Sequence, residues 1–407
     1  MRKIILVPDS FKGTMSSAEV CGIMAKAIRL HFPEAEIVSI PVADGGEGSV
    51  ESFLSAVGGR KVSVTVKGPY FEDIESFYGI LPDDTAVIEM AAASGLPLVG
   101  ENRGPGKTTT YGTGQLMVHA ARSGCKRIIV GLGGSATNDG GCGAAAAAGV
   151  VFRDSCGDPF IPVGETLNNI SSIDTGGIDD AVAGAEIITM CDIDNPLYGP
   201  DGAAYVFGPQ KGADEALVKV LDENLRHLAD IVKRDLGTDI SGIPGAGAAG
   251  GMGGGMAAFF GSRLKMGIET VLDVTGFDHL LEGADLVFTG EGKIDPQSLR
   301  GKVVAGVARR AKKAGVPVDA SVAAILRPTW PLLPMPMTTT RPGVASSSCT
   351  ACTNTWPRRA PRLCNAWASI SKVSRPRRRA CAASKGGGAD GALGMGEFYR
   401  SARPRLG

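Results

Sequence analysis

The first forty residues carry two kinds of hydrophobic pattern, which together predict a strand, a helix and a second strand. Ile4–Val7 is a short, unbroken apolar run bounded by Pro8, as expected of a strand buried in a parallel sheet. Ser16 followed three residues later by Glu19 is typical of a helix N-terminus, because each side chain can accept a hydrogen bond from the other residue's backbone N–H. Apolar residues then recur at helical spacing. Residues 36–42 form the next strand-like run, which completes a right-handed β–α–β unit.

The last part of the regular pattern resembles the first, with a strand, a loop and a helix in order, whereas the middle of the chain has a different pattern of strands and helices. Near the end, a strand is predicted at 285–289, a loop at 290–298 and a helix at 299–313. In the middle of the chain, strands are predicted at 61–66, 86–89 and 127–131. Helices are predicted there at 114–123 and 214–236. We therefore expect an α/β fold with a Rossmann-like parallel-sheet domain formed by both chain ends, residues 1–60 and 265–318. Residues 61–264 would form a second α/β domain inserted into it.

The orderly pattern stops after Val318. Residues 319–407 contain all three Trp residues of the chain, four of its nine Cys residues, and 14 Lys and Arg against 3 Asp and Glu. This Pro-, Arg- and Ser-rich tail has no helical or strand periodicity, and two interpretations stay open: a disordered basic extension, or a frameshift. The frameshift is favoured, because codons that can encode residues 324–331, re-read after one added G, give Gly-Asp-Ile-Ala-Ala-Asp-Val-Ala. That sequence is a sensible loop followed by a helix start.

Charge and hydropathy exclude several classes of protein. The first 318 residues hold 28 basic and 39 acidic side chains, so they lack the basic surface that nucleic-acid binding requires. No apolar stretch is long enough to span a bilayer, and the N-terminal apolar run is too short for a signal peptide. The nine cysteines have no paired spacing, which indicates free thiols. We therefore expect a cytoplasmic protein with neither a nucleic-acid nor a membrane partner.

Five loops are rich in glycine and carboxylates, and each follows a strand or precedes a helix. They comprise residues 8–13, 43–48, 131–141, 191–196 and 289–295. Ligands of open parallel sheets bind beyond the carboxyl ends of the strands, where these loops are expected. Glycine lets backbone N–H groups face phosphate oxygens, and carboxylates can hold Mg²⁺ or orient a hydroxyl group. The combination indicates phosphoryl transfer assisted by Mg²⁺.

Other interpretations of these motifs are weaker. Residues 100–108 nearly match a P-loop, but five residues separate the glycines where four are required. Gly131-x-Gly-x-x-Ala follows a strand, yet no acidic residue ends a second strand about twenty residues later, so a dinucleotide site has little support. A further glycine-rich run at 245–256 could cradle a nucleotide or allow close helix packing, and both remain open. The four His residues lie in helix-like segments away from the loops, so neither metal binding nor catalysis is expected of them.

The loops taken together resemble the bacterial type I glycerate kinase family. The segments that carry the resemblance are VPDSFKG (7–13), PVADGGEG (41–48), EMAAASGL (89–96), TTTYGTG (108–114), GLGGSATNDGG (131–141), CDIDNPLYGP (191–200), FGPQKGA (207–213), PGAGAAGGMGGG (244–255) and TGEGKID (289–295). The resemblance implies transfer of the ATP γ-phosphate to D-glycerate with Mg²⁺, to give 2-phosphoglycerate or 3-phosphoglycerate. It also implies two α/β domains with the active site in the cleft between them, and it leaves a homodimer open.

Site residues follow from this resemblance combined with the chemistry of the side chains. For catalysis, we expect Asp192, Glu291, Asp295 and Lys12. For substrate binding we expect Asp9, Ser10, Asp44 and Arg103, and for Mg²⁺ we expect Asp44 and Asp192. The residues expected to bind ATP are Gly133, Gly134, Ser135, Thr137, Asn138, Gly250 and Gly251.

Three other functions compete with this one. The first is a kinase for another small hydroxy acid, and the second is a non-catalytic protein that binds a nucleotide or metabolite. The third is a dinucleotide oxidoreductase. Several loops carry carboxylates, which favours a kinase over a binding protein, because binding alone needs no oriented nucleophile.

Overall fold

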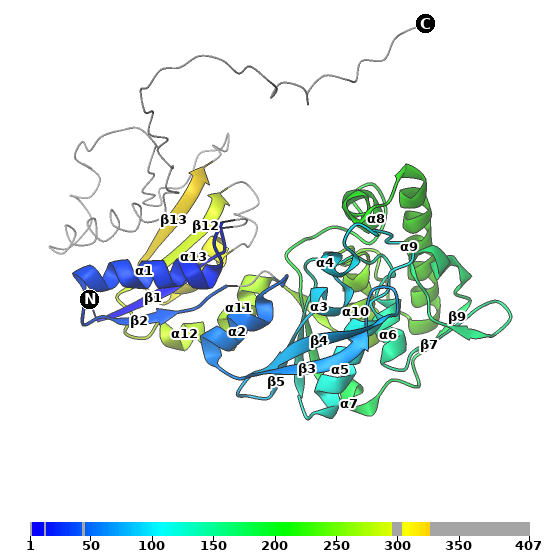
Figure 1. Ribbon diagram of the computed structural model, residues 1–407, viewed down its shortest axis with the longest axis horizontal. Helices are drawn as coiled ribbons and strands as arrows, with labels where there is room; N and C mark the ends of the chain where they lie inside the picture. The colour runs from blue at the N-terminus through cyan, green and yellow to red at the C-terminus, as the bar shows by residue number, and fades with distance from the viewer. Residues whose placement is uncertain (1, 12–13, 43–44, 295–302, 326–407) are drawn as a thin grey trace, which may run out of the picture.

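The computed structural model describes residues 2–11, 14–42, 45–294 and 303–325, and these form a mixed α/β structure (Figure 1). Two principal sheets carry the parallel strands, one of four strands and one of six. Parallel strands adjoin in both sheets, which confirms the α/β fold class expected from the sequence.

The four-stranded sheet joins the two ends of the described chain. Its strands are all parallel and lie in the order β13 (Val318–Ile325), β12 (Leu286–Ile294), β1 (Lys3–Pro8) and β2 (Glu36–Ser39). Side chains of β1 alternate between the two faces, so Ile4 and Leu6 share a core with helix α1 (Ser17–His31). Ile5 and Val7 pack with helix α13 (Val303–Lys313) instead, so the two helices cover opposite faces.

The start of α1 confirms the helix signal in the sequence. The Ser16 side chain accepts a hydrogen bond from the Glu19 backbone N–H, and the Glu19 carboxylate accepts one from the Ser16 N–H at 2.8 Å. The predicted strand at 36–42 is shorter in the structure, because β2 ends at Ser39. The remaining residues lead toward the glycine-rich loop.

Strand β13 extends into the segment that the sequence assigned to the atypical tail. Residues 319–325 continue the strand that begins at Val318, and they pair with β12 from Phe288 to Ile294. The described strand therefore continues seven residues beyond the change of composition. The sequence predicts a strand that starts at 315–318, but not its continuation through 319–325, because so short a segment carries little periodic signal. The predicted character of residues 326–407 lies outside the described residues.

The six-stranded sheet is built from the middle of the chain. Its order is β11 (Arg263–Lys265), β10 (Glu186–Met190), β6 (Arg127–Gly131), β5 (Thr85–Glu89), β4 (Asp73–Ile80) and β3 (Arg60–Lys67). The strands from β11 to β5 are parallel, whereas β3 and β4 pair antiparallel at one edge. A small antiparallel sheet has the order β8 (Pro159–Phe160), β7 (Val151–Arg153) and β9 (Ser172–Asp174).

The remaining helices connect and cover these sheets. They are α2 (Ser49–Val57), α3 (Ala91–Ser94), α4 (Leu96–Val99), α5 (Tyr111–Arg122), α6 (Cys142–Ala147), α7 (Asp180–Ala183), α8 (Ala203–Phe207), α9 (Glu215–Leu236), α10 (Met252–Phe260), α11 (Gly267–Val274) and α12 (Phe277–Leu280), with 3-10 turns η1 (Gly164–Asn169) and η2 (Pro209–Lys211). No helix in the described ranges is both long and apolar enough to cross a membrane.

One hydrophobic core spans the two principal sheets. It contains Val7 from the four-stranded sheet and Ile129 from the six-stranded sheet, with Phe53 of α2 and Ile268 of α11 among its members. Figure 1 shows α2 and α11 in the region between the sheets. The strands of the six-stranded sheet fall between Arg60 and Lys265, close to the predicted division of the chain, and the domain bounds themselves remain a prediction.

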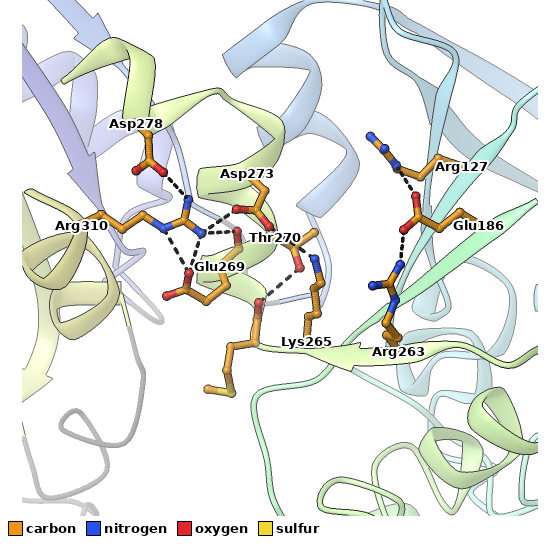
Figure 2. Close-up of polar contacts among 10 residues, drawn as sticks. Arg127, Glu186, Arg263, Lys265, Glu269, Thr270, Asp273, Asp278 and Arg310 are labelled. Carbon is orange, nitrogen blue, oxygen red and sulfur yellow. Dashed lines mark hydrogen bonds and ion pairs between the residues drawn. The ribbon is translucent and has the colours of Figure 1, made fainter. Parts of the chain in front are cut away.

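An ionic network fastens α13 to α11 (Figure 2). The Arg310 guanidinium donates to Glu269 at 2.5 Å and to Asp273 at 2.6 Å, and it also lies 3.6 Å from Asp278. Figure 2 also shows Glu186 of β10 between Arg127 of β6 and Arg263 of β11, so this carboxylate joins three neighbouring strands.

Replacing Arg310 by Met is expected to lower the free energy of unfolding by about 1–3 kcal/mol, because two carboxylates on α11 lose a half-buried partner. Arg309→Met is the matched control, since Arg309 contacts the same Glu269 from a more exposed position and should cost about 1 kcal/mol or less. Urea unfolding of both variants measures the difference. Equal losses would show that the network adds no stability beyond that of a surface ion pair.

Candidate functional site

A cavity of about 450 Å³ lies where loops from the two principal sheets meet. It is lined by Asp9, directly after β1, and by Val42 in the loop after β2. From the six-stranded sheet it receives residues 132–135, after β6, and 190–193, at the end of β10. The lining therefore comes from the carboxyl ends of parallel strands, and the volume suits a small-molecule ligand.

The two sheets are brought together here by direct contact between backbones. The Gly133 N–H donates to the Gly45 carbonyl oxygen at 2.9 Å. A Cβ atom on Gly133 would lie only 2.5 Å from the Gly46 Cα, and one on Gly131 would lie 2.4 Å from the Gly45 oxygen. Close approach therefore requires glycine at positions 131 and 133.

Asp9 and Asp192 face the cavity from different sheets. The Asp9 N–H donates to the Gly290 carbonyl at 2.8 Å, which fixes the turn after β1. The Asp192 side chain is exposed, and its Oδ1 accepts a hydrogen bond from the Gly267 N–H at 2.6 Å, at the first residue of α11. The structure brings these two predicted residues to one cavity. Their roles remain predictions.

The remaining predicted catalytic and substrate residues are placed differently. Glu291 is buried, and its carboxylate accepts a hydrogen bond from the Val304 N–H at 3.3 Å, at the start of α13. Ser10 donates its N–H to Asp9 and does not line the cavity. Arg103 does not line the cavity either: its guanidinium donates to the Gln210 carbonyl at 2.8 Å and so supports η2. Lys12, Asp44 and Asp295 lie outside the described residues.

The residues predicted to bind ATP divide into two groups. Gly133, Gly134 and Ser135 line the cavity. The other four lie behind it, namely Thr137, Asn138, Gly250 and Gly251. A Cβ on Gly250 would be 2.0 Å from the Thr137 carbonyl oxygen, so close packing explains this glycine. Within the described structure the Thr137 hydroxyl and both amide atoms of Asn138 are buried without a hydrogen-bond partner, so no contact yet accounts for these polar groups.

Sequence reasoning missed Asp139, which holds the loop after β6 in shape. Its side chain is fully buried and accepts hydrogen bonds from the Thr110 N–H and hydroxyl at 2.7 and 2.8 Å. It also accepts from the N–H groups of Gly141 and Gly143 at 3.1 and 3.2 Å. Burial raises the pKa of the Asp139 carboxyl above its usual value, while the hydrogen bonds oppose that shift. Its place within the GLGGSATNDGG segment was the available signal.

Lys211 is the second residue that sequence reasoning missed. It lines the cavity from η2 although its side chain is 2% exposed. Its Nζ donates to the Ser135 hydroxyl and to the Thr137 carbonyl, both at 2.7 Å. Burial lowers the pKa of this ammonium to about 7, and the negative charge of Asp139 acts in the opposite direction. The segment FGPQKGA contains this lysine, but nothing in the sequence reveals that it turns inward.

The cavity is better suited to Mg²⁺ bound together with substrate phosphates than to Mg²⁺ held by protein ligands alone. No group of three His, Cys, Asp or Glu side chains within the described ranges is arranged to hold a metal ion. Asp9 and Asp192 nevertheless line one cavity, and Mg²⁺ is commonly held by one or two carboxylates together with substrate phosphates. The donors present therefore fit Mg²⁺ bound together with a nucleotide.

Comparison with known proteins gives one consistent result. Residues 4–334 match the glycerate kinase family. The chain is 51% identical to a glycerate kinase of Bacillus cereus over 320 residues, which is 78% of this chain and 84% of that protein. It is 48% identical to the glycerate 2-kinase of Escherichia coli over 318 residues, again 78% of this chain and 84% of that protein. A crystal structure assigned to glycerate kinase 2 of Salmonella typhimurium LT2 superposes with a TM-score of 0.74 at 45% identity, covering 79% of this chain and 86% of the other.

Proposed function

Because the chain belongs to the glycerate kinase family, we propose that it transfers the γ-phosphate of ATP to the 2-hydroxyl of D-glycerate. The products would be 2-phosphoglycerate and ADP. Transfer to the 2-hydroxyl is favoured because one relative, at 48% identity, is a glycerate 2-kinase. Transfer to the 3-hydroxyl is the alternative that the product would reveal.

The observation that carries the proposal is a single cavity with two kinds of lining. A glycine-rich loop faces it at residues 133–135, and the carboxylates of Asp9 and Asp192 face it from two other strand ends. Phosphoryl transfer needs backbone and cationic groups for phosphate oxygens, and it needs an acidic group to orient the hydroxyl. The presence of both kinds of group in the lining of one cavity supports the proposal.

In the proposed reaction the hydroxyl oxygen of glycerate attacks the γ-phosphorus while the bond to the β–γ bridging oxygen breaks. ADP leaves with that oxygen, and the hydroxyl proton passes to a carboxylate. Asp192 is the favoured acceptor, because its side chain is exposed at the cavity and the Gly267 N–H holds it in place. Asp9 would orient the substrate from the opposite sheet. Mg²⁺, when bound with ATP, would neutralise phosphate charge.

The experiment that tests this function is ATP turnover by the purified chain with D-glycerate and Mg²⁺, with the product identified by NMR. Appearance of 2-phosphoglycerate supports the proposal, whereas 3-phosphoglycerate would show that the 3-hydroxyl is the acceptor. Turnover with another hydroxy acid alone would support a different small-acid kinase. Nucleotide binding without turnover would favour a non-catalytic binding protein. Light scattering of the same sample would test the expected homodimer.

We also retain the frameshift as a proposal for the tail. The similarity covers 78% of this chain and 84% of each of two relatives, so part of both remains unmatched. A change of frame near residues 324–331 would produce such a match. Resequencing the gene across these codons tests it, and a single intact frame would rule it out.

A further inference from the structure

The proposed ligands present an electrostatic problem at this cavity. Glycerate and ATP are both anions, yet Asp9 and Asp192 face the cavity. Within the described ranges, Lys211 is the cationic side chain in the lining. The Lys211 ammonium is buried, and a buried ammonium is costly unless a partner of opposite charge neutralises it in the functional state.

The position of Lys211 is fixed by the chain around it. The Ser135 hydroxyl and the Thr137 carbonyl take two of the three N–H donors of the ammonium, each at 2.7 Å. The adjacent Gln210 carbonyl is held by Arg103 at 2.8 Å, which fastens η2. The third donor of Lys211 has no partner in the described structure, although the residue lines the cavity.

The neighbouring backbone offers further donors. Gly134 has a φ of 75° and uses its carbonyl to accept from the Leu96 N–H at 2.9 Å. The N–H groups of Gly134 and Ser135 themselves make no hydrogen bond within the described part of the chain. Successive N–H groups beside a residue of positive φ form a concavity that binds anions, phosphate above all.

We propose that Lys211, together with the N–H groups of Gly134 and Ser135, binds a phosphate group of the nucleotide. This assignment rests on the proposed kinase function and adds to it the residue that receives the phosphate charge. Phosphate is favoured over the glycerate carboxylate because a lysine and two adjacent residues of a glycine-rich loop, whose N–H groups make no hydrogen bond within the described part of the chain, line the same cavity. Ser135 then acts as a positioning residue, since its hydroxyl holds the ammonium.

Binding at this position depends on pH with a definite sign. Lys211 has a pKa of about 7 in the unliganded protein, and a bound anion raises the pKa because it stabilises the charged form. The protein must therefore take up a proton to bind the anion above pH 7, so affinity should fall by up to tenfold per pH unit. Asp139, from the loop after β6, is the charged group that acts on Lys211, and Asp9 and Asp192 are the other charged residues that line the cavity.

The test uses the full chain and its Lys211→Met and Lys211→Arg variants. Calorimetry with tripolyphosphate, with a non-hydrolysable ATP analogue and with D-glycerate, each with Mg²⁺, is run between pH 6.5 and 8.5. Lys211→Met should weaken binding of both phosphate ligands about 10–100-fold at pH 6.5 and leave D-glycerate binding within twofold. Lys211→Arg should retain phosphate binding. Its affinity should not decrease above pH 7 as that of the wild type does, since arginine stays charged. Lys107→Met, which changes an exposed lysine outside the lining, is the matched control.

Each result of these binding experiments either supports or overturns the assignment of Lys211 to a phosphate group. Unchanged phosphate affinity in Lys211→Met overturns the assignment. A selective loss of D-glycerate binding would show that the lysine binds the substrate carboxylate instead. If Lys211→Met fails to fold, the pH dependence of the wild type against Lys211→Arg still decides. Absence of glycerate phosphorylation by the wild type would refute the proposed function alone, because tripolyphosphate binding tests Lys211 without turnover.

Discussion

Replacement of Asp192 by Asn is expected to lower kcat for glycerate phosphorylation by about 10²–10⁴-fold, the usual contribution of a positioned acid or base. The side chain faces the cavity at the end of β10, where its charge can accept a proton or contact Mg²⁺. Asn keeps the oxygen that accepts the Gly267 N–H, so α11 retains its N-terminal partner and folding should be preserved. Steady-state assays and thermal unfolding separate the two effects.

Asp194→Asn is the matched control for this experiment. Asp194 is an exposed acid two residues further along the same loop, and it does not line the cavity. Its replacement should change kcat by less than about twofold to threefold, as for a surface substitution. Near-normal turnover in Asp192→Asn, or equal losses in both variants, would remove Asp192 from the catalytic site.

Replacement of Gly133 by Ala is expected to reduce kcat/KM by about 100-fold and to destabilise the fold by about 1–3 kcal/mol. The added Cβ would lie 2.5 Å from the Gly46 Cα and 2.7 Å from its N, so the backbones of two loops must separate. That shift moves the loop at 132–135 against the rest of the cavity lining. Urea unfolding and glycerate kinetics together measure the loss.

Gly22→Ala provides the control for adding one methyl group. Gly22 lies on the exposed face of α1, and a Cβ there would meet no atom within 4 Å. Alanine favours helices over glycine, so this variant should be more stable by about 0.5–1 kcal/mol with unchanged activity. A Gly133→Ala protein with wild-type stability and activity would show that the two loops can separate freely.

Local elements were the best-predicted part of the fold. The helix start at Ser16 and the strand at Ile4–Val7 follow from interactions between near neighbours, which the sequence displays directly. The start of β13 near Val318 was predictable but its continuation was not, because residues 319–325 carry too short a pattern to distinguish a strand from the atypical tail. The close contact of Gly133 with Gly46 was not predictable either, since it joins residues 87 positions apart.

The candidate site divides in the same way. The glycine-rich and acidic segments identified the family and the chemistry, because phosphate and hydroxyl recognition require those residue types wherever they occur. Sequence could not show that Asp9 and Asp192 share a cavity while Arg103 and Thr137 stand outside it. Those placements depend on how two sheets pack through one hydrophobic core.

The sequence by itself determined the α/β class, the family and the loops where ligands are expected, because each is encoded in short contiguous segments. Only the tertiary structure determined that Lys211 and Asp139 are buried. Both belong to recognisable segments, but Lys211 is buried where η2 contacts the loop after β6, 74 and 76 positions away, and Asp139 is buried against Thr110, 29 positions away. Burial then sets their pKa values, since desolvation is a property of the folded surroundings and leaves no trace in the order of residues.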